Sequence, residues 1–400
     1  MLSSPERATA RPLVLTAAYY ASLALLGLAG AAEGPSLPTL AQHTASPLNR
    51  IGLLFVADSL GYLIGSMGGG RLYDKLPGHR LMSIMFLLIL AGAVFFPVAP
   101  YLWLLLALGF LMGIGKGAVD VGSNTLLQWV HGEGVSPFMN GLHFAYGLGA
   151  FIAPLLLAQI ILLTHEIHWV FWILAILIAP MAIWLWFLPG PAPQTQDGSA
   201  TADEVPLVPV LIMILAFVLY VGAELGFSNW IYTYAVTLNL ANTVTAAYLT
   251  SAYWASFTLA RLLGIWVSTR LRSRTILFID FAGCLISLGL IAIARDSAAM
   301  LWVGSISLGL ATASIFPTLL LLAGEKLKVT GTITGLFLLG SGVGSMLLPW
   351  LIGNAFTSVG PHAMINILFI DMALGLLAVV AFTFSAQPSA AGSSAAAPEQ

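Results

Sequence analysis

The chain has 400 residues, of which 59% are hydrophobic and 8% are charged, and its mean hydropathy is +0.96. Soluble proteins average about 45–50% apolar and about 25% charged residues, so this composition excludes a soluble globular protein and indicates an integral membrane protein. The net charge of −2 gives no sign of nucleic-acid binding, and a single cysteine, Cys284, excludes an intramolecular disulfide framework.

Apolar stretches of about 20 residues, the length that crosses a bilayer, recur along the whole chain. They predict twelve transmembrane helices near residues 13–33, 51–70, 81–99, 102–130, 139–164, 168–188, 207–237, 244–268, 275–294, 299–323, 331–356 and 363–385. We therefore expect an N-terminal six-helix bundle over 1–188, a polar cytoplasmic linker over 189–205 and a C-terminal six-helix bundle over 206–385. The low-complexity tail 386–400 is expected to be disordered.

Lys and Arg residues lie mainly on one side of these spans. That side receives Arg7, Arg11, Arg71, Lys75, Arg80, Arg270, Arg272, Arg274, Lys326 and Lys328, and the other side receives Arg50 and Arg295. Because positive residues gather in cytoplasmic loops, this bias predicts that both termini are cytoplasmic. Lys116 and Arg261 are left within spans, where a charge needs a partner or water.

Several residues repeat between the two halves at one offset, 195 residues. The matched positions are Gly69, Lys75, Gly147, Gly149 and Pro154 in the first half, and Gly264, Arg270, Gly342, Gly344 and Pro349 in the second. Glu33 and Glu224 also lie in similar Gly-Ala settings of spans 1 and 7, at an offset of 191. Such matches indicate a duplication with parallel halves, the arrangement of the major facilitator superfamily.

The loop "GGGRLYDKLPGHR" (68–80) resembles the cytoplasmic signature of that superfamily, Gly-x-x-x-Asp-Arg-x-Gly-Arg-Arg. The matching residues are Gly70, Asp74, Lys75, Gly78, His79 and Arg80, with one inserted residue and with Lys75 and His79 where Arg is usual. The resemblance implies twelve helices in two pseudo-symmetric bundles and a loop that helps to close the cytoplasmic side, where Asp74 can make a charge-assisted contact. Arg261 joins this gate as a candidate; snorkelling and substrate binding are its alternatives.

Eight charged residues lie at or within spans: Glu33, Asp58, Lys116, Asp120, Glu224, Arg261, Asp280 and Asp371. Inserting a charged side chain at the centre of a span costs about 2.5–3.5 kcal/mol, so most of these residues must be paired, neutralised or in contact with water. Lys116, Asp120 and Asn124 recur every fourth residue and so share one face of span 4. Two interpretations stay open: Lys116 and Asp120 form a structural pair, or Asp120 is an acid whose protonation or cation binding is coupled to solute movement.

The segment "GIGKGAVDVGSNTLLQW" of span 4 resembles the branch of the superfamily that contains fucose permease and the sodium-dependent glucose transporters. Residues 217–234 and 253–264 resemble spans 7 and 8 of the same branch. The resemblance implies that Asp120 couples a cation and that Asn124 contacts the substrate. Glu33, near the position of an acid in span 1 of the branch, is a second coupling candidate.

Polar and aromatic residues on spans 4, 5, 7 and 8 complete the expected site. The further candidates for substrate contact are Lys116, Asn140, His143, Tyr220, Ser228, Asn229, Trp254 and Thr258, and Glu224 is a third coupling acid. Donors, acceptors and flat rings suit sugar hydroxyls and ring faces. The alternatives are that His143 is a helix contact and that Trp230 and Tyr234 belong to an interfacial aromatic belt.

These patterns favour a secondary active symporter of a sugar or similar neutral polar solute, driven by a proton or sodium ion through alternating access. A proton-coupled exporter of drugs or amphipathic compounds is the alternative, and a non-transporting receptor is a third possibility. No P-loop, nucleophile elbow or metal-ligand spacing occurs in the sequence. We therefore expect no enzyme activity, no metal and no cofactor besides the coupling ion, and a monomer in the lipid bilayer.

Overall fold

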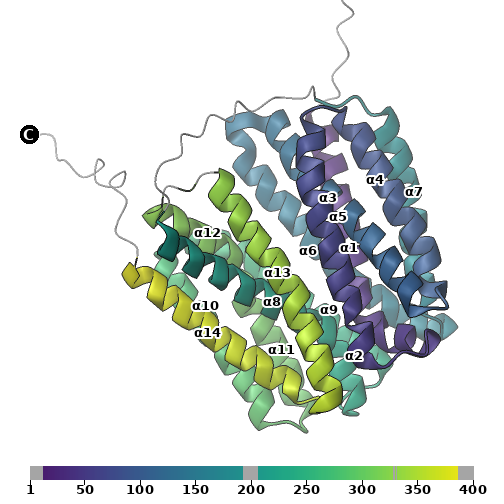
Figure 1. The fold of residues 1–400 in the computed structure, drawn as a ribbon, viewed down its shortest axis with the longest axis vertical. Helices are drawn as coiled ribbons and strands as arrows, with labels where there is room; N and C mark the ends of the chain where they lie inside the picture. The colour runs from purple at the N-terminus through teal and green to yellow at the C-terminus, as the bar shows by residue number, and fades with distance from the viewer. Residues whose placement is uncertain (1–11, 192–205, 328, 330, 386–400) are drawn as a thin grey trace, which may run out of the picture. The chain divides into compact units, whose positions relative to one another are not determined.

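The structure is a computed structural model that describes residues 12–191, 206–327, 329 and 331–385. These residues form fourteen α-helices and two short 3-10 helices, with no strand among them (Figure 1). Most of the expected linker (192–205) and the whole expected tail (386–400) lie outside the described residues, as do Arg7, Arg11 and Lys328.

The helices follow one another in chain order. They are α1 (Pro12–His43), α2 (Leu48–Ile51), α3 (Leu53–Tyr73), α4 (Gly78–Phe95), η1 (Phe96–Val98), α5 (Leu102–His131), η2 (Gly132–Val135), α6 (Ser136–Thr164), α7 (His168–Phe187), α8 (Leu207–Thr237), α9 (Thr243–Ser268), α10 (Ser273–Ile293), α11 (Ala298–Thr312), α12 (Ile315–Lys326), α13 (Gly331–Ser358) and α14 (Ala363–Ser385).

Ten segments of the described chain are long and apolar enough to cross a membrane. One of them, Leu102–Thr164, contains both α5 and α6, and α9 is not among the ten because Thr, Ser and Arg261 lower its hydropathy. Separating α5 from α6 and adding α9 gives the twelve spans that the sequence predicts. The all-helical membrane fold is therefore confirmed.

Two of the expected spans differ in detail from the helices. The first was expected near 13–33, but α1 continues to His43 through Pro35 and Pro38. The tenth, expected as one helix over 299–323, is divided into α11 and α12 at Ala313–Ser314. Pro317, in the first turn of α12, has no N–H to donate to a carbonyl of the preceding turn, which favours the division at this point.

The chain divides into two compact units. Unit 1 consists of Met1–Asp197 and Ile231–Ala255, and unit 2 consists of Gly198–Trp230 and Ser256–Gln400. Within unit 1, the first part of α9 packs on α6, where Ser251 Oγ donates a hydrogen bond to the Phe151 carbonyl (3.0 Å) and Gln159 Nε2 donates to the Tyr248 hydroxyl (2.6 Å). The bundle boundaries expected at 188 and 206 remain a prediction.

Helices α3 and α5 lie side by side in unit 1, with their backbones in direct contact (Figure 1). A Cβ on Gly113 would meet the carbonyl oxygen of Asp58, and a Cβ on Gly117 would meet that of Tyr62. Glycines four residues apart therefore let the two helices approach to backbone distance, as small residues do in membrane helix pairs. This approach brings the polar side chains of α3 next to Lys116 and Asp120.

The internal repeat reappears in the helix packing. In unit 1 a Cβ on Gly149 would meet the Ala24 carbonyl, and in unit 2 a Cβ on Gly344 would meet the Val218 carbonyl. Gly149 and Gly344 are thus equivalent, as their offset of 195 predicts. The carbonyls that they meet are 194 residues apart, however, which makes Phe227 the counterpart of Glu33. Glu33 and Glu224 are therefore not at equivalent positions.

Candidate functional site

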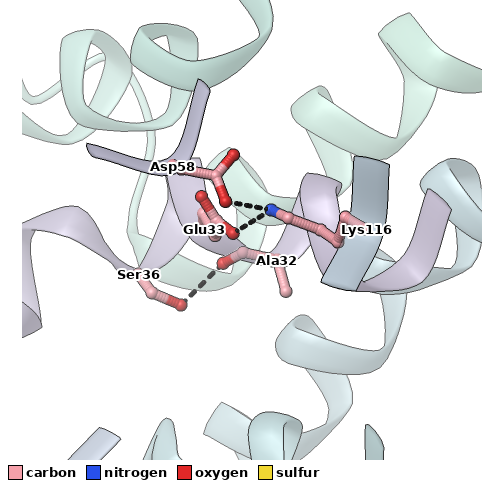
Figure 2. Close-up of polar contacts among 5 residues, drawn as sticks. All are labelled: Ala32, Glu33, Ser36, Asp58 and Lys116. Atoms are coloured by element: carbon pink, nitrogen blue, oxygen red, sulfur yellow. Dashed lines mark hydrogen bonds and ion pairs between the residues drawn. The ribbon is translucent and has the colours of Figure 1, made fainter. Parts of the chain in front are cut away.

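Lys116 on α5 lies between two carboxylates in the interior of unit 1. Its Nζ is 2.6 Å from Glu33 Oε1 on α1 and 2.6 Å from Asp58 Oδ1 on α3 (Figure 2). The side chains of Lys116 and Glu33 are 7% and 4% exposed, and that of Asp58 is 17% exposed. We call these three residues the lysine cluster. Lys116 is thus paired with Glu33 and Asp58, so the interpretation that it pairs with Asp120 is wrong.

Asp120 has its own partners one helical turn away. The Tyr62 hydroxyl of α3 donates a hydrogen bond to Asp120 Oδ2, and Asn124 Nδ2 donates to Asp120 Oδ1 at 2.9 Å. Asn124 Nδ2 also donates to the Asp120 backbone carbonyl at 2.9 Å. Both carboxylate oxygens therefore have a donor, an arrangement that satisfies an ionised acid.

These contacts form two successive rungs between α3 and α5. Asp58 contacts Lys116 in the first rung and Tyr62 contacts Asp120 in the second, and each helix advances by four residues between them. Residues four apart lie on one helix face, and the glycine contacts hold the two faces together. The lysine cluster and the Asp120–Asn124 pair are therefore neighbours on the same two helices, one turn apart.

Sequence reasoning did not include Tyr62 among the site residues and did not assign a role to Asp58. Both belong to the polar face of α3, which Ser66 continues at the same four-residue spacing. That spacing was the available signal. It was weak, because a tyrosine in an apolar helix is more often part of the hydrophobic core, and because the sequence does not show which face of α3 contacts α5.

In unit 2, Glu224 is joined to Tyr220 on the same helix, α8. The Tyr220 hydroxyl donates a hydrogen bond to Glu224 Oε2 and also lies 3.0 Å from the Thr312 carbonyl oxygen. That carbonyl is the last of α11, where the helix breaks before α12. The one proton of the Tyr220 hydroxyl is thus shared between Glu224 and a carbonyl that the interrupted helix leaves without its usual intrahelical partner. Arg261 on α9 supplies the positive charge that acts on Glu224.

The remaining substrate candidates lie at varied depths on their helices. Ser228, Trp254 and Thr258 are buried, Asn229 is half-buried, and Asn140 and His143 are exposed on α6. Their roles, like the expected contact of Lys116 with a solute, remain predictions. The Trp230 indole donates to the Pro349 carbonyl at 2.9 Å, and Trp230 and Tyr234 are both 0% exposed. Neither of these two rings therefore belongs to an interfacial belt.

The expected cytoplasmic gate residues of the 68–80 loop lie at the end of α3 and the start of α4. Asp74, Lys75 and Arg80 are exposed, and the Arg80 guanidinium lies 5.8 Å from the ring centroid of Trp186. Gly70 is half-buried, and Gly78 is buried where a Cβ would meet the Leu126 side chain. Within the described residues, neither Asp74 nor Lys75 takes part in an ion pair, so their gating role also stays a prediction.

His79, which stands where the family signature has Arg, has a defined structural role. Its Nδ1 donates to the Leu188 carbonyl at 2.9 Å, and its Nε2 accepts from the Tyr19 hydroxyl at 2.8 Å. Because a carbonyl oxygen can only accept, Nδ1 carries the proton in the neutral ring. This buried histidine ties the start of α4 to α1 and to the residue that follows α7.

The two acids of the last helices differ in their surroundings. Asp280 on α10 accepts a hydrogen bond from Ser314 Oγ at 2.6 Å, directly at the break between α11 and α12. Asp371 on α14 is 6% exposed, and its Oδ2 has no hydrogen-bond partner among the described residues. The Asp280 contact ties α10 to this break, whereas nothing in the described residues explains Asp371.

Comparison with solved structures identifies the architecture. The chain matches a crystal structure of a D-xylose-proton symporter with a TM-score of 0.77 and 14% identity, over 92% of this chain and 97% of the other. It matches the nucleoside transporter NupG with a TM-score of 0.73 and 16% identity, over 94% of this chain and 99% of the other. At these identities the likeness shows the fold alone.

Sequence comparison gives relatives in the expected branch. The chain is 28% identical over 368 residues to sodium-dependent glucose transporter 1 of Xenopus laevis, covering 82% of this chain and 72% of the relative. It is 26% identical to the Homo sapiens protein of that name, covering 87% and 77%. It is also 27% identical to major facilitator superfamily domain-containing protein 4A of Danio rerio, covering 92% and 87%.

A family model matches most of the sequence. Residues 19–349, which include every residue of the lysine cluster and of the Glu224 site, match the model described as Major Facilitator Superfamily. The twelve spans, the internal repeat and the 68–80 signature agree with that match. The chain is an integral, multi-pass membrane transporter of small molecules, and it belongs to the major facilitator superfamily.

Proposed function

We propose that this transporter is a cation-coupled symporter of a sugar or a similar neutral polar solute, working by alternating access. The observation that carries the proposal is the Asp120–Asn124 pair on the glycine-rich face of α5. Both residues are half-buried, and their carboxylate and amide groups are of the kinds that exchange hydrogen bonds with the hydroxyls of a sugar. Relatives named sodium-dependent glucose transporter 1 support the same substrate class.

The buried acids supply the coupling side of the proposal. Glu33 and Asp120 in unit 1 and Glu224 in unit 2 are carboxylates placed within membrane helices, where an ionisable residue marks an ion or substrate pathway. The coupling ion, a proton or sodium, is part of the proposal, as are the monomeric state and the cytoplasmic termini. Tyr220, Ser228, Asn229, Trp254 and Thr258 are the proposed contacts on α8 and α9, and Asn140 and His143 those on α6.

The test is uptake of labelled D-glucose, D-galactose, L-fucose and D-xylose into proteoliposomes that contain the purified full chain. The pH gradient and the sodium gradient are imposed separately. We expect one gradient to drive accumulation of at least one sugar. Absence of uptake for every sugar, together with gradient-driven efflux of an amphipathic dye, would overturn the proposal in favour of the exporter.

Asn124 can be tested against a matched residue. Asn124→Ala removes one hydrogen bond to the carbonyl four residues earlier and one to the Asp120 carboxylate, whereas Asn354→Ala on α13 removes a bond of the first kind alone, to the Trp350 carbonyl at 2.9 Å. We expect Asn124→Ala to raise KM for the transported sugar and Asn354→Ala to leave it unchanged. Equal effects of the two variants would contradict a substrate role of Asn124.

A further inference from the structure

We infer that the lysine cluster is the coupling-proton site of this transporter and that the proton binds to the Asp58 carboxylate. This inference deepens the proposed symport and rests on it. The cluster joins three helices of unit 1, and in Figure 2 the Lys116 side chain points between the two carboxylates. Asp58 lies outside the set of acids that the sequence singled out for coupling.

The charges of the cluster do not balance. One ammonium faces two carboxylates, so the cluster has a net charge of −1 when all three groups are ionised. A net charge in a buried site within a membrane span carries a large desolvation cost. Uptake of one proton by a carboxylate makes the cluster neutral, and release of the proton restores the charge. The site can therefore exist in two states that differ by one proton.

Asp58 is the most exposed member of the cluster. Its Oδ1 is buried against Lys116, yet the side chain as a whole is 17% exposed, and Figure 2 shows the second oxygen turned away from the ammonium. Glu33 is 4% exposed. In Asp120 both oxygens already accept hydrogen bonds from Tyr62 and Asn124. The free oxygen of Asp58 is thus the best-placed acceptor for an incoming proton.

The geometry favours a proton over a sodium ion. The Lys116 ammonium occupies the space between the two carboxylates, at 2.6 Å from an oxygen of each. A sodium ion would have to displace this tethered cation and assemble several oxygen ligands in its place. A proton requires no such space, because it forms an O–H bond on one carboxylate oxygen.

Protonation can be transmitted to the solute side through the two rungs. A neutral Asp58 attracts Lys116 less strongly, which weakens the first contact between α3 and α5. Tyr62, one turn farther along α3, donates a hydrogen bond to Asp120, and Asp120 also accepts a hydrogen bond from Asn124. The ionisable groups that face Asp58 are Glu33 from α1 and Lys116 from α5, with Asp120 and Tyr146 of α6 reached through Tyr62.

The first experiment tests proton binding without any substrate. Infrared difference spectra of the purified full chain in lipid, between alkaline and acidic buffer, record the C=O band of each carboxyl group that becomes protonated. We expect a band that is absent in Asp58→Asn, shifted in Asp58→Glu, and present in the control Asp371→Asn. Asp58→Asn leaves one ammonium and one carboxylate in the cluster, so it should fold. A band that survives in Asp58→Asn and disappears in Asp120→Asn would overturn the inference.

The second experiment connects the proton to transport. We expect Asp58→Asn to lose pH-driven accumulation of the sugar while it retains exchange of labelled for unlabelled sugar across the same membrane. Full accumulation by Asp58→Asn, or a band that responds to sodium in place of pH, contradicts the assignment. If wild-type chain moves none of the sugars, the proposed function fails, and the infrared result still decides whether Asp58 binds the proton.

Discussion

Lys116 and Asp120 lie one helical turn apart on α5, yet they contact different side chains. Lys116 is held by Glu33 and Asp58, whereas Asp120 accepts hydrogen bonds from Tyr62 and Asn124. A cation and an anion at this spacing would be expected to attract each other on an isolated helix. Here the neighbouring helices α1 and α3 supply better partners for both, and this division of partners determines which mutations should compensate one another.

Removal of the buried cation should destabilise the protein. In Lys116→Met two buried carboxylates lose their shared partner, so we expect a loss of about 3–5 kcal/mol. The loss should be smaller in acidic buffer, because protonation neutralises the unpaired carboxylates. The measurement is thermal unfolding of the purified protein in detergent.

Double variants identify the partner of Lys116. Asp58→Asn added to Lys116→Met should recover part of the lost thermal stability, because one of the two unpaired carboxylates is removed. Asp120→Asn added to Lys116→Met should recover none. Recovery by Asp120→Asn in place of Asp58→Asn would show that Lys116 and Asp120 are paired after all.

The Tyr62 hydroxyl should contribute to solute binding through Asp120. Tyr62→Phe leaves Asp120 Oδ2 without its donor, and a hydrogen bond to a charged group contributes about 1.5–3 kcal/mol. We therefore expect KM for the transported sugar to rise about tenfold or more, with pH-driven accumulation still present. Tyr20→Phe is the control, since the Tyr20 hydroxyl donates to the Phe138 carbonyl. Equal KM values for Tyr62→Phe and the control would refute the relay.

Tyr220 should be important for the stability of unit 2. Tyr220→Phe removes the one hydroxyl proton that Glu224 and the Thr312 carbonyl share, and a buried group left unsatisfied costs about 1–3 kcal/mol, more where the group is charged. Tyr73→Phe serves as a matched control, because the buried Tyr73 hydroxyl donates to one backbone carbonyl, that of Ala118, at 3.0 Å. Thermal unfolding should show a larger loss for Tyr220→Phe than for Tyr73→Phe. The reverse order would mean that the Glu224 contact contributes little.

The close contact of α3 and α5 should not tolerate a methyl group. In Gly117→Ala the new Cβ would meet the Tyr62 carbonyl, which belongs to the backbone and cannot move independently of its helix. Overpacking of this kind costs about 1–3 kcal/mol, and it should also disturb the Tyr62–Asp120 contact. Gly68→Ala on α3 is the control, since no atom lies within 4 Å of its added Cβ. Comparable thermal unfolding of the two variants would contradict the tight packing.

Much of the architecture follows from the sequence because it depends on local composition. Apolar stretches long enough to cross a bilayer predict the helices, and the matched positions of Gly149 and Gly344 predict a repeat that the helix packing confirms. The span-4 stripe also identifies the helix on which Lys116, Asp120 and Asn124 meet their partners. The spans and the stripe can be predicted because, within one helix, the spacing of residues in the sequence determines their spacing in the structure.

Partner choice was decided by the tertiary structure. The sequence places Lys116 nearest to Asp120. Glycine contacts between backbones set how α1 and α3 are rotated about their own axes. This rotation directs Glu33 and Asp58 toward Lys116, and Tyr62 contacts Asp120. The break between α11 and α12 is likewise supported from outside that segment, by Tyr220 on α8 and by Asp280 on α10. Helical periodicity determines which side chains share a face, and only the packing of one helix against another determines which face each of them meets.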